Sequence, residues 1–350
     1  MVRSAALRWR IGNKPNGRHV NGHSIPHLGG IALFLGVAVS MLLTVGRQTA
    51  ASANAVLIAR AVPAVLLIFV LGLVDDTRSL AARRKLAFQV LASASVVAVG
   101  FRLFTGMVFD VSSFTLAAVS LVFLVGMLSS VNLVDGHDGL AAGVAMLSAI
   151  AFAVIAVMMQ MPEVVALALA VCGACLGFLV FNFPPGRIYM GDTGSMLLGL
   201  LLALTACLIT MRAPSVNTFA AVCFALGVPL LDTALAIARR VVLRSPLFGA
   251  DSLHMHHVLR DAGLSPRQTL VVLYGVQAFF SLLGVGAAMG WVLPVVVGLG
   301  FVTVAFVSFL RMMVEGRDVP AAMGHQPANT IPFQSTFTTN LPERRTSVGR

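Results

Sequence analysis

Long, continuously apolar runs constrain the fold of this chain more than any other feature of its sequence. A helix needs roughly 20 apolar residues to cross a bilayer, and ten segments of about that length are candidates: 28–46, 55–73, 86–103, 111–131, 139–159, 161–183, 193–211, 217–236, 270–290 and 292–310. The mean hydropathy of +0.93 lies far outside the range of soluble domains. Because the runs do not alternate, a β-barrel is disfavoured. We expect an all-α, polytopic membrane protein with about ten transmembrane helices.

The connections between these spans are short, which predicts one helical domain over residues 28–310. Residues 1–27 are basic, and no apolar run precedes them, so a cleavable signal is not expected. The tail, residues 311–350, is rich in Pro, Thr and Arg, a composition typical of disorder.

Basic residues are concentrated on one side of the predicted spans. When the chain is threaded through them, only four of its 24 Lys and Arg residues lie on or near the other side: Arg47, Arg60, Arg102 and Arg212. By the positive-inside rule, the basic side, which carries both termini, faces the cytoplasm. The net charge of +11 therefore suits anionic headgroups or anionic substrates. Nucleic-acid binding is disfavoured, because no soluble domain carries the charge.

The few acidic residues lie at span ends on the same cytoplasmic side. The second, fourth and sixth spans end in "GLVDDTRSLAARRKL", "VNLVDGHDGLAAG" and "GRIYMGDTGS". These motifs and the eighth span contain Asp75, Asp76, Asn132, Asp135, Asp138, Asp192 and Asp232. One such residue alone would be interpreted as a helix cap or a solvated helix end. The whole set predicts a shared site.

Adjacent carboxylates predict a cation at this site. Asp75 and Asp76 repel each other and cost free energy unless a positive charge lies near them. Mg²⁺ prefers oxygen ligands and commonly keeps waters while it binds substrate phosphate. Asn132 offers a neutral amide oxygen and Asp192 a charged one, and Gly191 allows close backbone approach. We therefore expect a Mg²⁺ and phosphate site at the cytoplasmic membrane surface.

Histidines form a second cluster in the longest polar connection, residues 237–269. His254, His256 and His257 lie there among arginines, and imidazole and guanidinium N–H groups favour binding of a diphosphate or a sugar. A zinc site and a plain solvated loop stay open as alternatives. An N-terminal segment, "GNKPNGRHVNGHSIPHLGG", is either a phosphate-contacting segment or an ordinary juxtamembrane one; its candidates are Lys14, Arg18, His19, His23 and His27.

The motifs "DD", "NLVDGHDGL", "YMGDTGS" and "HMHH", in this order on cytoplasmic loops, resemble those of the polyprenyl-phosphate N-acetylhexosamine-1-phosphate transferases. The resemblance covers about residues 12–310. It implies Mg²⁺-dependent transfer of a sugar 1-phosphate from a UDP-sugar to a polyprenyl phosphate, with release of UMP, as the first membrane step of cell-envelope glycan synthesis. The histidine motif and "GLSPRQ" look closer to the N-acetylglucosamine-1-phosphate branch than to the muramoyl-pentapeptide branch.

The resemblance also implies roles for individual residues. Asn132 and Asp192 resemble the family's metal-binding pair. Asp75 and Asp76 resemble its catalytic aspartates, one of which would deprotonate or orient the lipid phosphate. The residues implied in substrate binding are Asp135, Asp138, Lys85, His254, His256 and His257. Direct in-line displacement is preferred, and a covalent aspartyl-phosphate route stays open.

Three departures from the family pattern put the subfamily and the sugar, but not the metal site, in question. The family usually has eleven spans, whereas only residues 1–11 precede the basic N-terminal segment, so either the first span is missing or the chain starts too far downstream. His27 stands where Arg or Thr is expected. Ser252 and Val258 flank the histidine motif at positions often occupied by Arg.

Two other functions stay open from the sequence. A secondary transporter also carries intramembrane carboxylates, but it would place them near mid-span and often repeat its halves, and neither pattern is present here. An inactive relative that only binds lipid phosphate is the second. The predicted partners are a UDP-sugar, a polyprenyl phosphate and membrane lipid, in the inner (plasma) membrane with the site facing the cytoplasm; a monomer and a homodimer both fit.

Overall fold

The computed structural model describes residues 29–45, 52–103, 112–242, 244 and 254–315, and every regular element among them is an α-helix. The prediction of an all-α fold is confirmed. In chain order the helices are α2 (Gly29–Val45), α3 (Ala53–Arg78), α4 (Ala82–Ala98), α5 (Ser113–Val134), α6 (Leu140–Met158), α7 (Pro162–Asn182), α8 (Gly191–Arg212), α9 (Val216–Ala225), α10 (Gly227–Val242), α11 (Met255–Asp261), α12 (Pro266–Ala288) and α13 (Val292–Glu315).

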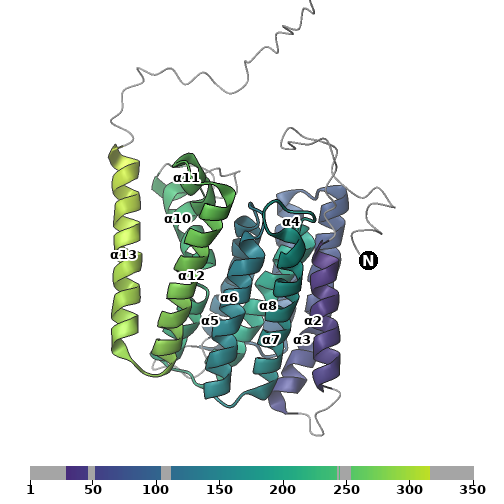
Figure 1. Cartoon of the computed structure of the whole chain (residues 1–350). Helices are drawn as coiled ribbons and strands as arrows, with labels where there is room; N and C mark the ends of the chain where they lie inside the picture. The colour runs from purple at the N-terminus through teal and green to yellow at the C-terminus, as the bar shows by residue number, and fades with distance from the viewer. Residues whose placement is uncertain (1–28, 46–51, 104–111, 243, 245–253, 316–350) are drawn as a thin grey trace, which may run out of the picture. The chain divides into compact units, whose positions relative to one another are not determined.

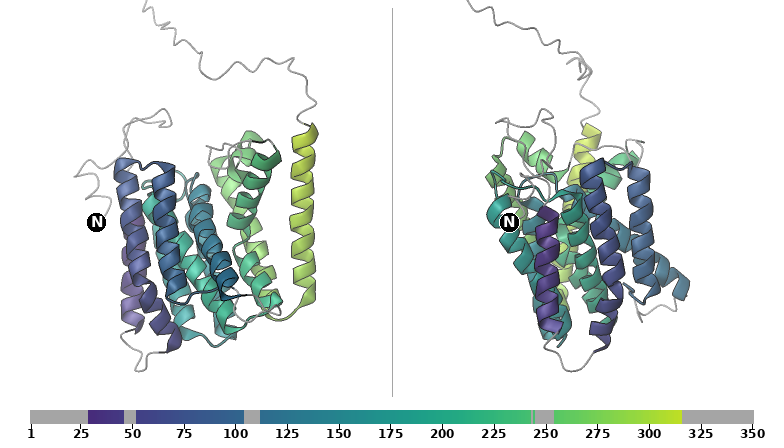
Figure 2. Two further views of the ribbon diagram at one scale, coloured as in Figure 1. Left: turned by 180° about the vertical axis from the view of Figure 1, so that it is seen from behind. Right: turned by 90° about the vertical axis from the view of Figure 1, so that its right-hand side faces the viewer.

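Most of these helices are long and apolar, and the long ones among residues 29–307 run roughly side by side (Figures 1 and 2). Six helices have the length and composition to cross a membrane, namely α3, α5, α6, α7, α8 and α12, and the bent pair α9 and α10 would make a seventh span. Helices α2 and α13 are also apolar, but their apolar stretches are shorter than those of the six helices. The chain is therefore a multi-pass membrane protein, and the predicted count of ten spans stays a prediction.

The eighth predicted span, 217–236, is not one straight helix. It breaks after Ala225 into α9 and α10, whose axes differ by 84°. Pro229 explains the break, because a proline has no N–H to donate to the carbonyl four residues earlier and its ring collides with that carbonyl. Gln277 of α12 binds the two freed backbone groups: its Nε2 donates to Ala225 O (2.8 Å) and its Oε1 accepts from Val228 N (3.0 Å).

Helix α8 lies in the middle of the bundle and determines where the polar residues meet. The most apolar stretch of this helix is 94% buried, and the helix packs against α3 and α5, among others. Helices α3 and α5 run antiparallel to α8, so their C-terminal ends lie beside its N-terminal end (Figure 1). The polar residues that end α3 and α5 and the first turn of α8 are brought together in this way.

Candidate active site

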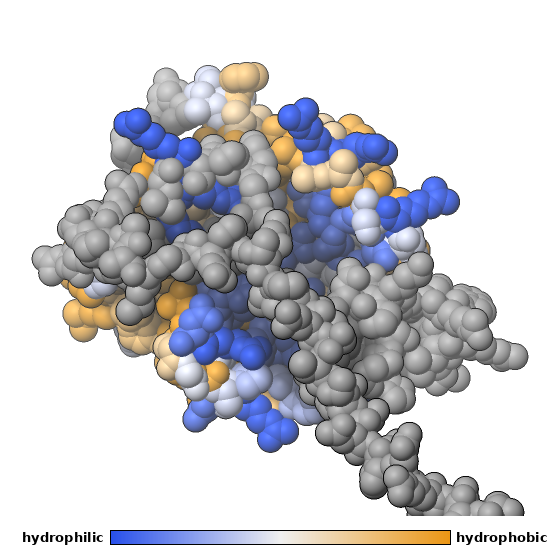
Figure 3. Space-filling model, turned by 90° about the horizontal axis from the view of Figure 1, so that it is seen from above, coloured by the Kyte–Doolittle hydropathy of each residue, from blue (hydrophilic) through white to orange (hydrophobic). Residues whose placement is uncertain are grey.

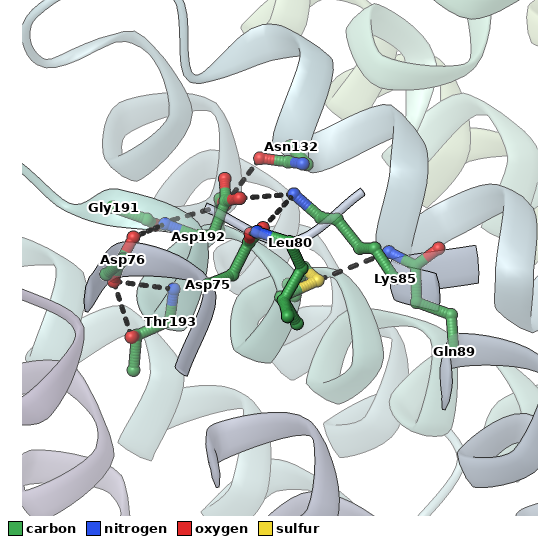
Figure 4. Close-up of polar contacts among 11 residues, drawn as sticks. Asp75, Asp76, Leu80, Lys85, Gln89, Asn132, Gly191, Asp192 and Thr193 are labelled. Atoms are coloured by element: carbon green, nitrogen blue, oxygen red, sulfur yellow. Dashed lines mark hydrogen bonds and ion pairs between the residues drawn. The ribbon is translucent and has the colours of Figure 1, made fainter. Parts of the chain in front are cut away.

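Two carboxylates, an amide and an ammonium group meet where α3, α4, α5 and α8 come together (Figure 4). Lys85 Nζ lies 3.0 Å from Asp75 Oδ2 and is in still closer contact with Asp192 Oδ2. The side-chain amide of Asn132 is oriented with its oxygen toward Lys85 and its nitrogen toward Asp192. In this orientation the oxygen accepts a hydrogen bond from Lys85 (2.8 Å) and the nitrogen donates one to Asp192 Oδ1 (2.8 Å). Oxygen atoms from three helices therefore surround one cation.

The short connection between α3 and α4 places Lys85 at this point. Helix α3 ends at Arg78, its C-cap Ser79 has a left-handed φ of 49°, and Asp75 Oδ1 accepts a hydrogen bond from Leu80 N (2.6 Å). The chain then turns directly into the first turn of α4, which carries Lys85. A buried carboxylate without a cation is strongly unfavourable, so Lys85 compensates the charge of the buried Asp75 and also pairs with the partly exposed Asp192. The predicted substrate-binding role of Lys85 did not include this pairing.

Asp76 holds the N-terminus of α8. Its Oδ1 accepts from the backbone N–H of Asp192 (2.7 Å), and its Oδ2 accepts from the backbone N–H (3.1 Å) and the hydroxyl of Thr193. These are donors that a helix leaves unpaired at its start, and the residue before α8, Met190, provides no side-chain cap. Asp76 therefore positions Asp192, while its predicted catalytic role stays a prediction.

Two glycines allow this close approach. Gly191 has a φ of +71°, and a Cβ there would lie 2.5 Å from Asp76 Oδ2. A Cβ on Gly72 would lie 2.3 Å from Thr193 Cα and 2.6 Å from Thr193 N, so the backbones of α3 and α8 touch at this position. Sequence reasoning missed Gly72, although a glycine one helical turn before the paired aspartates is a signal that could have identified it.

Asp135 and Asp138 lie in the turn between α5 and α6, which is tied to the segment after α7. Asp138 Oδ2 accepts from Gly186 N (2.9 Å). The buried side chain of Asn182 accepts from Gly139 N (2.7 Å) and donates to Ile188 O (2.8 Å). Asn182 is a second residue that sequence reasoning missed; its signal is an amide at the end of an apolar span, directly before the Gly- and Pro-containing segment.

The carboxyl group of Asp135 has a pKa well above the ordinary value. Burial is the main cause, and the negative charges of Asp192, Asp76 and Asp138 add to it. The carboxylates of Asp76 and Asp192 therefore act on Asp135 through their charges. Figure 3 looks onto this end of the molecule and shows hydrophilic side chains gathered among apolar ones.

Asp135→Asn is expected to stabilise the protein at neutral pH, by about 2 °C or more in Tm. A raised folded-state pKa means that ionisation favours the unfolded state, so stability falls as the pH rises from the ordinary Asp pKa of about 3.9 to the folded-state pKa. The gain from the substitution should therefore be present at neutral pH and absent below pH 4. Thermal unfolding at both pH values measures it, with the exposed Asp261→Asn as the control. Equal Tm values for Asp135→Asn and the unchanged protein at pH 7 would contradict the assignment.

The histidines pack against α10 and the α5–α6 turn. Asp232 of α10 accepts from His254 Nδ1 (2.8 Å) and from Met255 N (2.8 Å), which fixes the start of α11. The ring of His256 is buried against Gly136, and its burial, together with the nearby His257, lowers its pKa to about 4. His256 is therefore neutral at physiological pH.

A zinc site at the histidines finds no support in the part of the chain that the structure describes. No group of three or more His, Cys, Asp or Glu side chains there is arranged to hold a metal ion. The N-terminal candidates, Lys14, Arg18, His19, His23 and His27, lie outside the described residues. All other predicted site residues, from Asp75 to His257, lie at one end of the helices.

The oxygen atoms around Lys85 fit the predicted Mg²⁺. Asp75, Asn132 and Asp192 direct two carboxylate oxygens and one amide oxygen at a single positive charge. These are the ligand types that Mg²⁺ prefers, and a set of three leaves positions for water and phosphate. The residues that would hold the ion are thus brought together from α3, α5 and α8.

Known proteins with similar sequences identify the family. Residues 58–210 match glycosyl transferase family 4. A Bacillus subtilis protein, named as a probable undecaprenyl-phosphate N-acetylglucosaminyl 1-phosphate transferase, is 32% identical over 81% of this chain and 78% of its own. A decaprenyl-phosphate N-acetylglucosaminephosphotransferase of Mycolicibacterium smegmatis is 34% identical over 91% of this chain and 86% of its own. A phospho-N-acetylmuramoyl-pentapeptide-transferase of Moorella thermoacetica is 32% identical over 69% of this chain and 78% of its own. The chain therefore belongs to glycosyl transferase family 4, as a member of the polyprenyl-phosphate N-acetylhexosamine-1-phosphate transferases.

Proposed function

We propose that this protein transfers N-acetylglucosamine 1-phosphate from a UDP-sugar to a polyprenyl phosphate and releases UMP. The observation that carries the proposal is the cluster of Asp75, Lys85, Asn132 and Asp192 at the polar end of an apolar helix bundle. Relatives similar to most of the chain are named for this reaction. Neither a transporter nor an inactive relative is favoured by these names.

The reaction joins two anions, so it needs positioning and neutralisation of charge more than covalent chemistry. An oxygen of the lipid phosphate attacks the sugar-bearing phosphorus of the donor, and the bond from that phosphorus to the UMP oxygen breaks. Asp75 orients the lipid phosphate for this attack. Lys85 contributes its positive charge to the phosphates, and the turn with Asp135 and Asp138 binds the nucleotide sugar.

Asn132 and Asp192, with Asp75, would hold Mg²⁺, which when bound neutralises negative charge on the donor diphosphate. Asp76 keeps Asp192 in place through the N-terminus of α8. This division of roles explains why two adjacent aspartates are needed: one faces the reacting groups, and the other holds the helix that carries the metal ligand.

We further propose that the protein lies in the plasma membrane and that its site faces the cytoplasm. Basic residues flank the site end of α3 and α4, at Arg78, Arg83 and Arg84, whereas Arg102 and Arg212 lie at the opposite helix ends. This distribution supports the orientation under the positive-inside rule.

Release of UMP by purified protein tests the reaction. With UDP-N-acetylglucosamine, a polyprenyl phosphate and Mg²⁺, we expect UMP and a polyprenyl diphosphate-linked sugar, and we expect chelation of the metal to stop both. A panel of other UDP-sugars measures the sugar preference, and sealed vesicles of both orientations measure the sidedness. Lack of UMP release with every UDP-N-acetylhexosamine would overturn the proposed function, and turnover only from the extracellular side would overturn the orientation.

A further inference from the structure

His137 is a buried histidine between the two aspartates of the α5–α6 turn. It is only 8% exposed, and its Nδ1 lies 3.0 Å from the carbonyl oxygen of Asp138. Because a carbonyl oxygen only accepts hydrogen bonds, Nδ1 must carry the proton in this contact. In this tautomer Nε2 presents a lone pair and acts as an acceptor.

Within the described part of the chain, the Nε2 atom of His137 has no hydrogen-bond partner. Among the residues that the structure describes, three buried side-chain polar atoms lack one: Ser93 Oγ, His137 Nε2 and His256 Nε2. Two of these three belong to neighbouring rings, since His137 and His256 meet edge to face with ring centres 6.4 Å apart. An unpaired buried polar atom costs about 1–3 kcal/mol. Two such atoms on neighbouring rings point to a ligand in this turn.

The chemistry of the free nitrogen limits what this ligand is. Oxygen atoms of an ionised phosphate only accept hydrogen bonds, so Nε2 in this tautomer does not pair with the diphosphate of the donor. The matching group is an N–H or O–H, which the nucleoside and the N-acetylated sugar of a UDP-sugar both carry. The lipid acceptor has an apolar chain and a phosphate, and it offers no such group when its phosphate has lost both protons.

We propose that His137 is a specificity-determining residue, whose Nε2 accepts a hydrogen bond from an N–H or O–H group of the nucleotide-sugar donor. The proposal rests on the proposed function and adds a residue to it. It places donor recognition in the α5–α6 turn, between Asp135 and Asp138, with the ring of His256 beside it. The groups that contact Lys85 are Asp75, Asn132 and Asp192, so the proposal gives His137 no part in the displacement itself.

Three substitutions of His137 distinguish the roles of its two ring nitrogens. Gln places a polar atom near the position of Nε2, Asn places one near Nδ1 and Leu places none. In the full-length protein in detergent, we expect His137→Leu and His137→Asn to raise the KM for UDP-N-acetylglucosamine about tenfold, which corresponds to ~1.4 kcal/mol. His137→Gln should stay within about threefold of the unchanged protein. The KM for polyprenyl phosphate should not change in any of the three.

Donor binding is also measured without turnover, as the rise in Tm that UDP-N-acetylglucosamine produces. This rise should be smaller for His137→Leu than for the unchanged protein at the same donor concentration. Ser93→Ala is the matched control, because it removes the third unpaired atom from mid-α4 and should alter neither KM. Comparison of UDP-N-acetylglucosamine with UDP-glucose shows whether the acetamide N–H is the partner.

Other outcomes overturn the inference. If Asn restores the KM and Gln does not, the contact of Nδ1 with the Asp138 carbonyl is the only role of His137. If His137→Leu lowers the Tm of the free protein but leaves the KM and the donor-induced rise unchanged, the ring is a packing residue. Turnover by the unchanged protein separates both results from a failure of the proposed function, in which no UDP-sugar would release UMP.

Discussion

Asp192→Asn is expected to lower the rate of UMP release by a factor on the order of 10² or more, equivalent to roughly 2.7 kcal/mol of activation free energy. The substitution keeps the shape of the side chain and removes its charge. Asp192 contacts Lys85 and Asn132, so this change weakens the oxygen set proposed for Mg²⁺ and the neutralisation of the donor diphosphate. UMP release against Mg²⁺ concentration, for both proteins, measures the effect.

Thermal unfolding shows whether the loss is chemical or structural. Asp192 is partly exposed at the start of α8, and its backbone N–H keeps its bond to Asp76 in the variant, so the fold should persist. Asp261→Asn, an exposed carboxylate at the end of α11, makes the same chemical change away from the cluster and should retain full activity. Near-normal activity of Asp192→Asn with unchanged metal dependence would refute its role as a ligand. Loss of folding together with activity would make it a structural residue.

Gly72→Ala is expected to abolish most of the activity without altering any polar group. The new Cβ would lie 2.3 Å from Thr193 Cα and 2.9 Å from Asp192 O, whereas carbon atoms in contact are about 3.5–4.0 Å apart. These are backbone atoms that cannot rotate aside, so α3 and α8 must separate by about 1 Å or more. A displacement of that size at a catalytic site costs about 10²-fold in rate, and the strain costs about 1–3 kcal/mol of stability.

Gly177→Ala is the matched control for this prediction. It makes the same substitution inside α7, at a position where a Cβ would meet nothing within 4 Å. An alanine there should be neutral or stabilising by up to about 1 kcal/mol, with normal UMP release. Normal activity and stability of Gly72→Ala would show that α3 and α8 do not need this contact.

Much of the fold was predictable because the bilayer allows few alternatives. Backbone N–H and C=O groups have no water to bind inside a membrane, so an apolar run of sufficient length becomes a helix. For this reason nine of the ten predicted spans each coincide with one helix, within about five residues at the ends, while the span 217–236 corresponds to the bent pair α9 and α10. The sequence also contains a cause of the bend between α9 and α10, because Pro229 breaks a helix. The freed backbone groups at the bend bind to Gln277, which lies 49 residues from Val228, and this partner was not predictable from the local sequence.

The sequence also identified most of the polar residues of the site, because polar groups are scarce in this chain and therefore stand out. Their separate roles were not predictable in the same way. Asp75 and Asp76 are neighbours with the same side chain, yet Asp75 pairs with Lys85 and Asp76 binds the N-terminus of α8. Successive residues on a helix point in directions about 100° apart, and only the packing of neighbouring helices decides what each one meets.

The sequence by itself determined that this is an apolar helical protein with carboxylates and histidines at the ends of its spans, since both properties follow from local composition and order. The tertiary structure alone decided which of those groups touch. Lys85 and Asp192 are 107 residues apart and Asp76 and Asp192 are 116 apart, so their contacts depend on the antiparallel packing of α3 and α8. That packing requires a glycine at position 72, because two helix backbones come into contact only where no side chain lies between them.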